Sequence, residues 1–575
     1  MRTWYFGAVL VTALVGLLWI PRILGPIDLR YDAAVYYALG TSLAEGQGYR
    51  IVSEPGAPTG IQYPPGLPAL VAAHQVLLGT NDPEIVGAWL RWTYAAMYLG
   101  LGLAVFTLGR FYGGQWLGLA ATFLCLCQSN TLLLSDLLFT ELPFTLVAVC
   151  FALLLVNERL QQRPGWREGA GCLLAFTAFM LRTAGLALLF AWVVEALARK
   201  RWKLAVVRIV LSAVPFLLWQ GHVMRVQSSD EYRKPAYEYQ RAPYQYYNVS
   251  YADNLALIDP FTPERGYLNT AEIVSRVAAN LRVLPAALGE VVSEHAGFWR
   301  AAMYSVLNRK TPTDPVPSSL YVPLWLLALI IVVGTRVLLR NGAWFIVAFV
   351  IASVGLVLAT PWPAQFPRYV TPLSPFLAIA AVLGALAIGQ RLSRPVRGWS
   401  GTLGIGVLSG LFIVTALVQA YSVRNIFLVR YHGAAVGPDA GKILTPKWFY
   451  HDSTWTDWAK AVDWIEQNTP PDAIIATVSP HLAYLKTGRL SVMPPMEPDP
   501  ARANALMKQV PVSYVIVDEL EFVDLSRRYA LPALNHDSSQ WRRVYHENQT
   551  SIYQSVSAPN HGPIAGTLQR EVPLM

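Results

Sequence analysis

The chain has 575 residues, of which 54% are hydrophobic and only 14% are charged. An ordinary soluble domain carries about 25% charged residues, so this composition argues against a soluble enzyme. The aromatic content of 12% excludes a disordered chain. All four cysteines lie inside apolar runs, so we interpret them as core residues and predict neither a disulfide framework nor a cysteine-based metal site.

The net charge of +9 is unevenly distributed. Residues 421–575 contain 14 Lys/Arg and 15 Asp/Glu, so the surplus belongs entirely to residues 1–420. There it falls in short clusters between apolar runs, which is the pattern of a multi-span membrane protein with its cations on one side. A nucleic-acid site needs a continuous basic surface, so we predict no nucleic-acid partner.

A membrane-spanning helix needs about 20 mainly apolar residues. Stretches of this kind occur at 3–24, 86–108, 115–133, 137–156, 204–222, 321–339, 343–360, 371–389 and 401–421. A further apolar stretch, 169–198, is interrupted by Arg182 and Thr183. The first stretch lacks a clear cleavage site, so we interpret it as a retained span and not as a removed signal peptide.

The cationic loops decide how 169–198 crosses the membrane. Loops before residue 169 and after residue 198 keep their Lys and Arg on the same side only if this stretch crosses an even number of times. We therefore predict two short helices with Arg182 at their outer tip. The total is then about eleven spans, with the N-terminus cytoplasmic and the C-terminus outside.

Three large segments then lie on the outer side. The first loop, 25–85, contains one helix predicted at 32–45 and a second after Tyr63, both expected to lie along the membrane interface. The second, 223–320, contains a tyrosine-rich part followed by an amphipathic helix at 270–295. We expect two domains, a membrane domain at 1–421 that includes both loops and an extracytoplasmic α/β domain at 422–575.

The C-terminal domain shows a helical pattern at 454–468, before a Pro-Pro pair. Strand patterns follow at 473–478, 490–493 and 513–517, separated by short helices. The predicted fold class is thus a mainly α, polytopic helix bundle with a small α/β domain.

Ionisable residues gather at the outer ends of the predicted spans. Asp32 follows the first span, Asp136 and Glu141 flank a short outer turn, and Arg182 and Arg368 belong to the same side. Charges near apolar membrane depth are costly and often functional, and arginine binds phosphate through two parallel hydrogen bonds. The group indicates a cavity for an anionic, lipid-linked substrate.

Structural explanations compete with this interpretation at each position. Asp32 and Asp136 are each placed to cap a helix, Arg182 to extend to lipid head groups, and Arg368 to pair with a nearby acid. Their shared side of the membrane favours a common site.

Six short segments form a recognisable set: RYDAAVYY at 30–37, YPPG at 63–66, FTE at 139–141, MLR at 180–182, PRYVTP at 367–372 and TGR at 487–489. They resemble motifs of the GT-C superfamily of polytopic membrane glycosyltransferases. The branch most similar is that of the bacterial protein mannosyltransferase-like and aminoarabinose-transferase-like enzymes. Two features differ from other family patterns: Ala33 stands where a second acid is frequent, and we find no Trp-Trp-Asp motif in the C-terminal domain.

The resemblance implies transfer of a sugar from a polyprenyl-phosphate carrier to a lipid, glycan or protein acceptor. The reaction would take place on the extracytoplasmic face of the membrane, which in a bacterium is the inner membrane. Asp32 would take or orient the acceptor proton in a single displacement with inversion, and Asp136 or Glu141 would position hydroxyl groups. The substrate-binding residues would be Arg182, Arg368, Tyr31, Tyr36, Tyr63 and Tyr369. No cofactor and no metal is predicted, because the histidines are scattered.

Two other classes of function remain open on sequence grounds. A transporter or flippase of lipid-linked or polysaccharide substrates predicts ionisable groups at mid-membrane and matched broken helices in two halves. A non-catalytic membrane scaffold would not require Arg182 and Arg368 to converge near Asp32.

Overall fold

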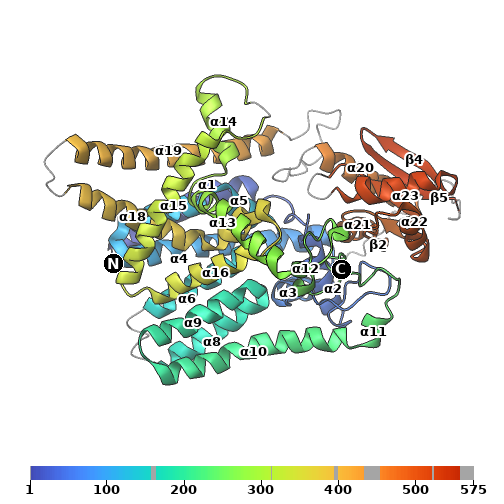
Figure 1. Cartoon of the computed structure of the whole chain (residues 1–575), viewed down its shortest axis with the longest axis horizontal. Helices are drawn as coiled ribbons and strands as arrows, with labels where there is room; N and C mark the ends of the chain where they lie inside the picture. The colour runs from blue at the N-terminus through green and yellow to red at the C-terminus, as the bar shows by residue number, and fades with distance from the viewer. Residues whose placement is uncertain are drawn as a thin grey trace.

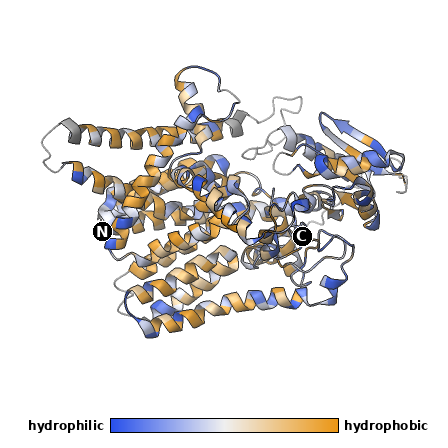
Figure 2. Ribbon diagram, in the orientation of Figure 1, coloured by the Kyte–Doolittle hydropathy of each residue, from blue (hydrophilic) through white to orange (hydrophobic). Residues whose placement is uncertain are grey.

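A computed structural model describes residues 2–156, 164–311, 314–393, 399–432, 453–520 and 524–556. Most of the described chain is a bundle of long helices, and a small sheet domain lies at one end of it (Figure 1). Hydrophobic residues dominate the helices of the bundle, whereas hydrophilic residues are frequent in the sheet domain (Figure 2).

Eleven helices form the framework of the described bundle. Their bounds are α1 (Arg2–Trp19), α4 (Pro83–Leu126), α5 (Ser129–Asp136), α6 (Glu141–Val156), α8 (Pro164–Leu181), α9 (Leu186–Ala198), α10 (Trp202–Gln227), α15 (Val322–Arg340), α16 (Trp344–Leu358), α18 (Ser374–Ser393) and α19 (Trp399–His432). Six helical stretches in the described residues are long and apolar enough to cross a membrane, and others, including α6, α9 and α16, are apolar but shorter. The chain is therefore an integral membrane protein.

The long α4 changes direction at Gly113 and Gly114. Gly114 has a φ of 83°, a left-handed conformation that glycine adopts at little cost. The two halves of α4 correspond to two separately predicted spans, 86–108 and 115–133, and the second is continued by α5.

The predicted break at Arg182 is present. Helix α8 ends at Leu181, a short 3-10 turn occupies Thr183–Gly185, and α9 begins at Leu186. Arg182 itself is extended, with φ −158° and ψ 134°, so the helical conformation is interrupted at this residue.

Glycine allows α15 and α18 to pack very closely. A Cβ atom at Gly334 would lie 1.7 Å from the carbonyl oxygen of Ala380, and one at Gly384 would lie 2.1 Å from that of Ile330. Small residues at such contacts let helices in membranes approach at the level of their backbones. Helix α18 begins a few residues after the segment that carries Arg368, so this close contact fixes the helix that follows that segment.

The two predicted helices of the first loop exist as α2 (Ala33–Ala44) and α3 (Gly66–Leu78). The expectation that both lie along the membrane interface is wrong for α2. Nearly all of its residues are buried, because it packs against α3 on one side and against a helix of the sheet domain on another. The first loop is thus an inner part of the fold.

The segment between α10 and α15 contains α11 (Asp230–Arg233), α12 (Tyr251–Ala256), α13 (Thr270–Val292) and α14 (Ala296–Val306). A capping box starts α13: the Asn269 side chain accepts from the Glu272 amide at 3.0 Å, and Glu272 accepts from the Asn269 amide at 2.7 Å. The C-terminal half of α13 is buried, where the helix packs on α15.

The sheet domain contains the predicted helix as α20 (Ser453–Asn468), followed by α21 (Pro480–Thr487), α22 (Pro500–Gln509) and α23 (Leu531–His536). Its five strands, in the order β2-β1-β3-β5-β4, are β1 (Ile475–Ala476), β2 (Ser491–Val492), β3 (Tyr514–Val517), β4 (Trp541–Glu547) and β5 (Thr550–Ser555). The first three are parallel and fall within the predicted ranges, whereas β4 and β5 form an additional antiparallel hairpin. Helix α19 continues beyond residue 421, the expected domain boundary, to His432.

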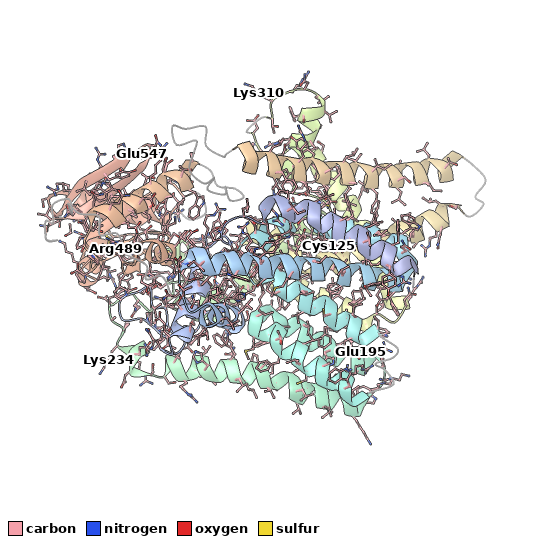
Figure 3. All side chains as sticks on the ribbon, turned by 180° about the vertical axis from the view of Figure 1, so that it is seen from behind. Cys125, Glu195, Lys234, Lys310, Arg489 and Glu547 are labelled. Carbon is pink, nitrogen blue, oxygen red and sulfur yellow. The ribbon has the colours of Figure 1, made fainter. Side chains whose placement is uncertain are left out.

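The two ends of the molecule carry different charged groups. Figure 3 shows Glu195 at the end of the bundle that is far from Arg489 and Glu547 of the sheet domain. At that end Arg208 pairs with Glu195 and with Glu168. The long axis of the bundle therefore separates this cluster of Glu195, Arg208 and Glu168 from the sheet domain.

Candidate active site

Four charged side chains from four separate segments meet between the bundle and the sheet domain. Asp32 directly precedes α2, Glu141 is the first residue of α6, Arg182 joins α8 to the following turn, and Arg368 lies in the short helix α17 (Phe366–Val370). The first two segments are tied together by backbone hydrogen bonds: Asp28 donates to Asp136 at 3.1 Å, and Leu138 donates to Asp28 at 3.0 Å.

Arg368 bridges the two carboxylates. Its Nη2 donates to Oδ2 of Asp32 at 2.8 Å, and its Nε donates to Oε1 of Glu141 at 3.0 Å. Nη1 of Arg182 lies 2.6 Å from the same Oε1 of Glu141. Two carboxylates and two guanidiniums thus form one neutral cluster, whose arginines come from segments far apart in the sequence.

Burial differs sharply within this cluster. The side chain of Glu141 is 1% exposed, whereas those of Asp32 and Arg368 are 14% and 25% exposed. A buried carboxylate is tolerated only when its charge is compensated, and the two guanidiniums provide this for Glu141. Glu141 therefore anchors both arginines, while Asp32 and Arg368 remain open to a ligand.

Asp32 occupies the position before the first residue of α2, yet its carboxylate bonds other side chains and not the amides of that helix. The Tyr247 hydroxyl donates to Oδ1 of Asp32 at 3.3 Å, while Oδ2 accepts from Arg368. The helix-capping explanation of Asp32 is thus wrong. Tyr31, just before it, has a φ of 59°, a conformation that non-glycine residues adopt rarely and often at functional sites.

Two cavities open on this cluster and share Asp32, Arg368 and Tyr246 as wall residues. The first has a volume of about 270 Å³ and includes Arg182. Its wall also contains apolar residues of the bundle, among them Leu186 and Leu356, whose side chains are partly exposed. We call it the bundle cavity.

The second cavity has a volume of about 250 Å³ and lies against the sheet domain, which contributes Val478 and Met493 to its wall. We call it the domain cavity. Aromatic residues form much of its lining: Tyr31, Phe139, Tyr246, Tyr247, Phe261 and Trp362. Asn130 and Gln365 provide its amide groups.

The predicted tyrosines are divided between the two cavities. Tyr36, Tyr63 and Tyr369 line the bundle cavity, and the rings of Tyr36 and Tyr63 lie 4.7 Å apart. Tyr31 lines the domain cavity and packs edge-on against Trp455 of α20 at 5.5 Å.

Asp136 lies outside the cluster of Asp32, Glu141, Arg182 and Arg368. This position differs from the prediction that Asp136 serves the site together with Glu141. Its Oδ1 accepts from Nη1 of Arg91 at 3.0 Å and lies 3.8 Å from Nη1 of Arg22. All three side chains are buried, and Asp136 is not among the described residues that line the two cavities. Asp136 is the last residue of α5, and its carboxylate pairs with Arg91 and Arg22 inside the bundle.

No group of three or more His, Cys, Asp or Glu suited to a metal ion is present in the described parts of the chain. Arg368 bridges the carboxylates of Asp32 and Glu141 in the candidate site. A divalent cation between them would have to displace that guanidinium. The residues present therefore do not fit a metal at this position.

A second polar cluster lies behind the domain cavity and was not predicted. Glu54, in the first loop, accepts from the Tyr237 hydroxyl at 3.1 Å and from the Asn248 amide at 2.7 Å. Burial raises the pKa of Glu54 to about 7, although these hydrogen bonds and Arg241 oppose the shift. Asn248 is adjacent to Tyr247, so the cluster supports the segment that reaches Asp32.

The neighbouring residue, Ser53, ties the first loop to the sheet domain. Its hydroxyl lies 2.7 Å from Nδ1 of His481, and its carbonyl accepts from the Ser491 amide at 2.9 Å. Burial lowers the pKa of His481 to about 3, so this imidazole is neutral. The TGR segment at 487–489 does not join the two domains through Arg489. Its guanidinium donates to the carbonyls of Thr469 and Thr487 inside the sheet domain.

The sequence signals for these clusters were incomplete. The tyrosine-rich segment was visible before Tyr251, but no pattern singled out Tyr247 or paired it with Asp32. Glu54 lies in a loop sequence without periodicity. In both cases the partner comes from a distant segment, which one sequence alone does not reveal.

No protein-family model matches the chain, and neither does any curated protein. Solved structures do match. The oligosaccharyltransferase AglB from Archaeoglobus fulgidus, in complex with an inhibitory peptide and a dolichol-phosphate, is similar over 96% of this chain and 74% of its own, with 13% identity and a TM-score of 0.52. Its apo form is similar over 98% and 75%, with 13% identity and a TM-score of 0.51.

ArnT from Cupriavidus metallidurans, bound to undecaprenyl phosphate, matches over 96% of this chain and 98% of its own, with 13% identity and a TM-score of 0.49. The AglB matches extend over the bundle and the sheet domain alike. The chain therefore has the fold of the GT-C glycosyltransferases, as its short motifs predicted.

Proposed function

We propose that this protein is a membrane glycosyltransferase that moves a sugar from a polyprenyl-phosphate donor to an acceptor hydroxyl on the extracytoplasmic face of the membrane. The observation that carries the proposal is the position of Asp32 and Arg368 in the shared wall of two cavities. A group-transfer reaction needs one place for the donor, one for the acceptor, and reactive groups at their junction.

The bundle cavity suits the donor. Arg182 and Arg368 supply permanent positive charge for a phosphodiester, and guanidinium groups bind phosphate oxygens in a bidentate manner. The apolar wall, with partly exposed Leu186 and Leu356, suits a polyprenyl chain that enters from the lipid. The complexes of AglB with a dolichol-phosphate and of ArnT with undecaprenyl phosphate contain lipids of this chemical kind.

The domain cavity suits the acceptor, because it opens toward the sheet domain and is lined by aromatic and amide groups. An acceptor hydroxyl placed beside Asp32 would lie at the junction of the two cavities. The Tyr247 hydroxyl holds Oδ1 of Asp32 and thereby orients the carboxylate toward that junction.

The proposed reaction is one displacement at the anomeric carbon. Asp32 takes the proton of the acceptor hydroxyl as its oxygen attacks the carbon, and the bond from that carbon to the phosphate oxygen breaks. The electron pair leaves with polyprenyl phosphate, and the configuration inverts. General-base assistance of this kind is worth about 10²–10⁴ in rate, and the arginines stabilise charge on the departing phosphate.

Arg368 is placed to exchange one of its two partners. Its guanidinium pairs with both Asp32 and Glu141. A donor phosphate competes with Asp32 for the guanidinium, because both are anions, whereas Glu141 keeps it in place. Donor binding would thus release Asp32 to act as a base in the presence of the donor only.

The proposal includes the predicted orientation, in which the N-terminus is cytoplasmic, the sheet domain is extracytoplasmic, and the membrane is a bacterial inner membrane. Cations near the end of the bundle marked by Glu195 in Figure 3, such as Arg199 and Arg208, agree with a cytoplasmic side there.

The test is a transfer assay with the full chain reconstituted in lipid vesicles. Polyprenyl phosphate carrying a labelled sugar is supplied with a membrane fraction as the source of acceptors. We expect the label to leave the donor and to appear in an acceptor in proportion to the enzyme. A donor that is neither consumed nor protective against thermal unfolding would contradict the proposal.

A transporter of lipid-linked substrates would also bind the donor, so binding alone does not separate the two functions. Transport would move the intact donor between leaflets, whereas transfer breaks the bond between sugar and phosphate. Appearance of sugar-free polyprenyl phosphate in the same vesicles distinguishes them.

A further inference from the structure

We propose that Gln62 and Tyr63 form the subsite that binds the sugar of the donor, by donating hydrogen bonds to its hydroxyl oxygens. The inference deepens the proposed function and rests on it. Both residues line the bundle cavity, immediately before the turn made by two prolines, and neither is assigned by the mechanism above to the phosphate or to the acceptor.

Gln62 has a fixed orientation and an unused donor. Its side chain is 2% exposed, and its Oε1 accepts from Nδ2 of Asn254 at 3.3 Å. The same Nδ2 donates to the carbonyl of Tyr246 at 3.1 Å, which holds Asn254 in place. The Nε2 group of Gln62 has no hydrogen-bond partner among the described residues.

Tyr63 also combines a fixed position with an unused hydrogen-bond donor. Its hydroxyl is buried without a hydrogen-bond partner in the described structure, whereas its backbone carbonyl accepts from the Tyr49 hydroxyl at 2.8 Å. Its ring packs against that of Tyr36. The backbone and the ring are therefore held by contacts within the protein, and the hydroxyl is the group without a hydrogen-bond partner in the described structure.

Buried donors without partners are rare in folded proteins, because they lose their hydrogen bonds to water without compensation. Two such donors in consecutive residues on the wall of one cavity indicate a ligand with acceptor oxygens. Phosphate oxygens and sugar hydroxyls both fit this description.

The charges of the cavity favour the sugar. Arg182 and Arg368 are available for the phosphate, whereas Gln62 and Tyr63 are neutral, and the ring of Tyr63 packs against that of Tyr36. Neutral amide and hydroxyl donors next to an aromatic face suit a polar ring with hydroxyl groups. Since a site built for substrate hydroxyls rejects analogues that lack them, these two residues would select among sugars.

The experiment measures how strongly three lipids protect the full chain from thermal unfolding in detergent micelles. The probes are bare polyprenyl phosphate, polyprenyl-phosphate mannose and polyprenyl-phosphate arabinose. The variants are Gln62→Met, which keeps the length of the side chain, and Tyr63→Phe, which removes one hydroxyl. Tyr37→Phe is the matched control, because the Tyr37 hydroxyl bonds the Asn81 carbonyl and Tyr37 is not among the cavity residues.

We expect the wild-type chain to bind at least one glycosylated lipid more tightly than the bare phosphate. Gln62→Met and Tyr63→Phe should each reduce that affinity by about 3- to 10-fold, the loss of one hydrogen bond, and change bare polyprenyl phosphate by less than about 2-fold. The control should change neither.

Three outcomes overturn the inference. The variants weaken bare and glycosylated lipids equally, the variants change neither, or the wild-type chain binds no glycosylated probe more tightly than the bare phosphate. If the wild-type chain binds none of the three lipids, the donor assignment itself fails, which is a distinguishable result.

Discussion

Nη2 of Arg368 donates to Oδ2 of Asp32 at 2.8 Å, although the two residues are 336 positions apart in the chain. The guanidinium also bonds Glu141 and lies over the ring of Phe139, 4.3 Å from its centroid. The segment that contains Phe139 and Glu141 thus fixes a cation against the carboxylate that we propose as the base.

Arg368→Lys tests the two-sided contact. Lysine keeps the charge but cannot present a planar fork to Asp32 and Glu141 together, so we expect the affinity for polyprenyl phosphate to fall by about 10-fold or more. The measurement is the concentration of lipid that gives half of the maximal thermal protection. Arg502→Lys, at an exposed position of α22, is the control, and equal affinities of both variants would speak against a phosphate role for Arg368.

Asp136→Asn tests whether that residue is structural. The substitution removes the charge that compensates Arg91 and Arg22 in a buried environment, and breaking buried pairs typically costs about 3–5 kcal/mol. We expect the midpoint of thermal unfolding to fall, with donor affinity per folded molecule unchanged. If the variant unfolds at the temperature of the wild type but has lost transfer activity, Asp136 has a catalytic role and not a structural one.

Tyr247→Phe tests the orientation of Asp32. The change deletes one hydroxyl and its hydrogen bond to Oδ1, while the ring keeps its contact with His481 at 4.8 Å. We expect kcat to fall by about 3- to 10-fold, as for the loss of one hydrogen bond, with donor affinity retained. Loss of donor binding at unchanged kcat would place Tyr247 in the donor site.

Glu54 gives a pH dependence with a defined sign. Its pKa in the folded protein is raised to about 7 from an ordinary 4.5, so its contribution to stability is fully present below pH 4.5 and is lost as the pH rises to about 7. At pH 8, Glu54→Gln should then be more stable than the wild type by up to about 3 kcal/mol. At pH 4 the two should be alike.

The measurement for Glu54→Gln is the unfolding midpoint across pH 4–8. The control is Glu238→Gln, an exposed carboxyl of the same outer region, which should leave the profile of the wild type unchanged. A Glu54→Gln profile parallel to that of the wild type at every pH would show that this carboxyl does not take up its proton on folding.

Much of the bundle was predictable, because hydropathy over about 20 residues fixes where helices run. The break between α8 and α9 followed from the charge rule, and the sheet domain's first three strands followed from local patterns. The hairpin of β4 and β5 was missed, since its turn at Asn548, with a φ of 51°, lies in a polar stretch without clear alternation.

The sequence indicated which charged residues could gather in one region better than it indicated which acid pairs with which arginine. Asp136 and Glu141 are separated by one short turn, and the sequence does not tell which of them pairs with Arg182 and Arg368. The distinguishing partner is Arg91, a buried arginine inside the apolar α4, which required an acid from another helix. Similarly, the spacing of hydrophobic residues predicted the helix α2. It did not predict that α21 of the sheet domain would pack against this helix.

The most direct measurement compares sugar transfer by Asp32→Asn and by Asp82→Asn, each reconstituted in vesicles with labelled donor. Asp82 caps α4, a role that asparagine fills equally well, so its variant should retain the wild-type rate. The account predicts that Asp32→Asn inserts, unfolds at a temperature close to that of the wild type and still binds polyprenyl phosphate, but transfers sugar about 10²–10⁴ times more slowly. A rate within a few-fold of the wild type would contradict the central claim.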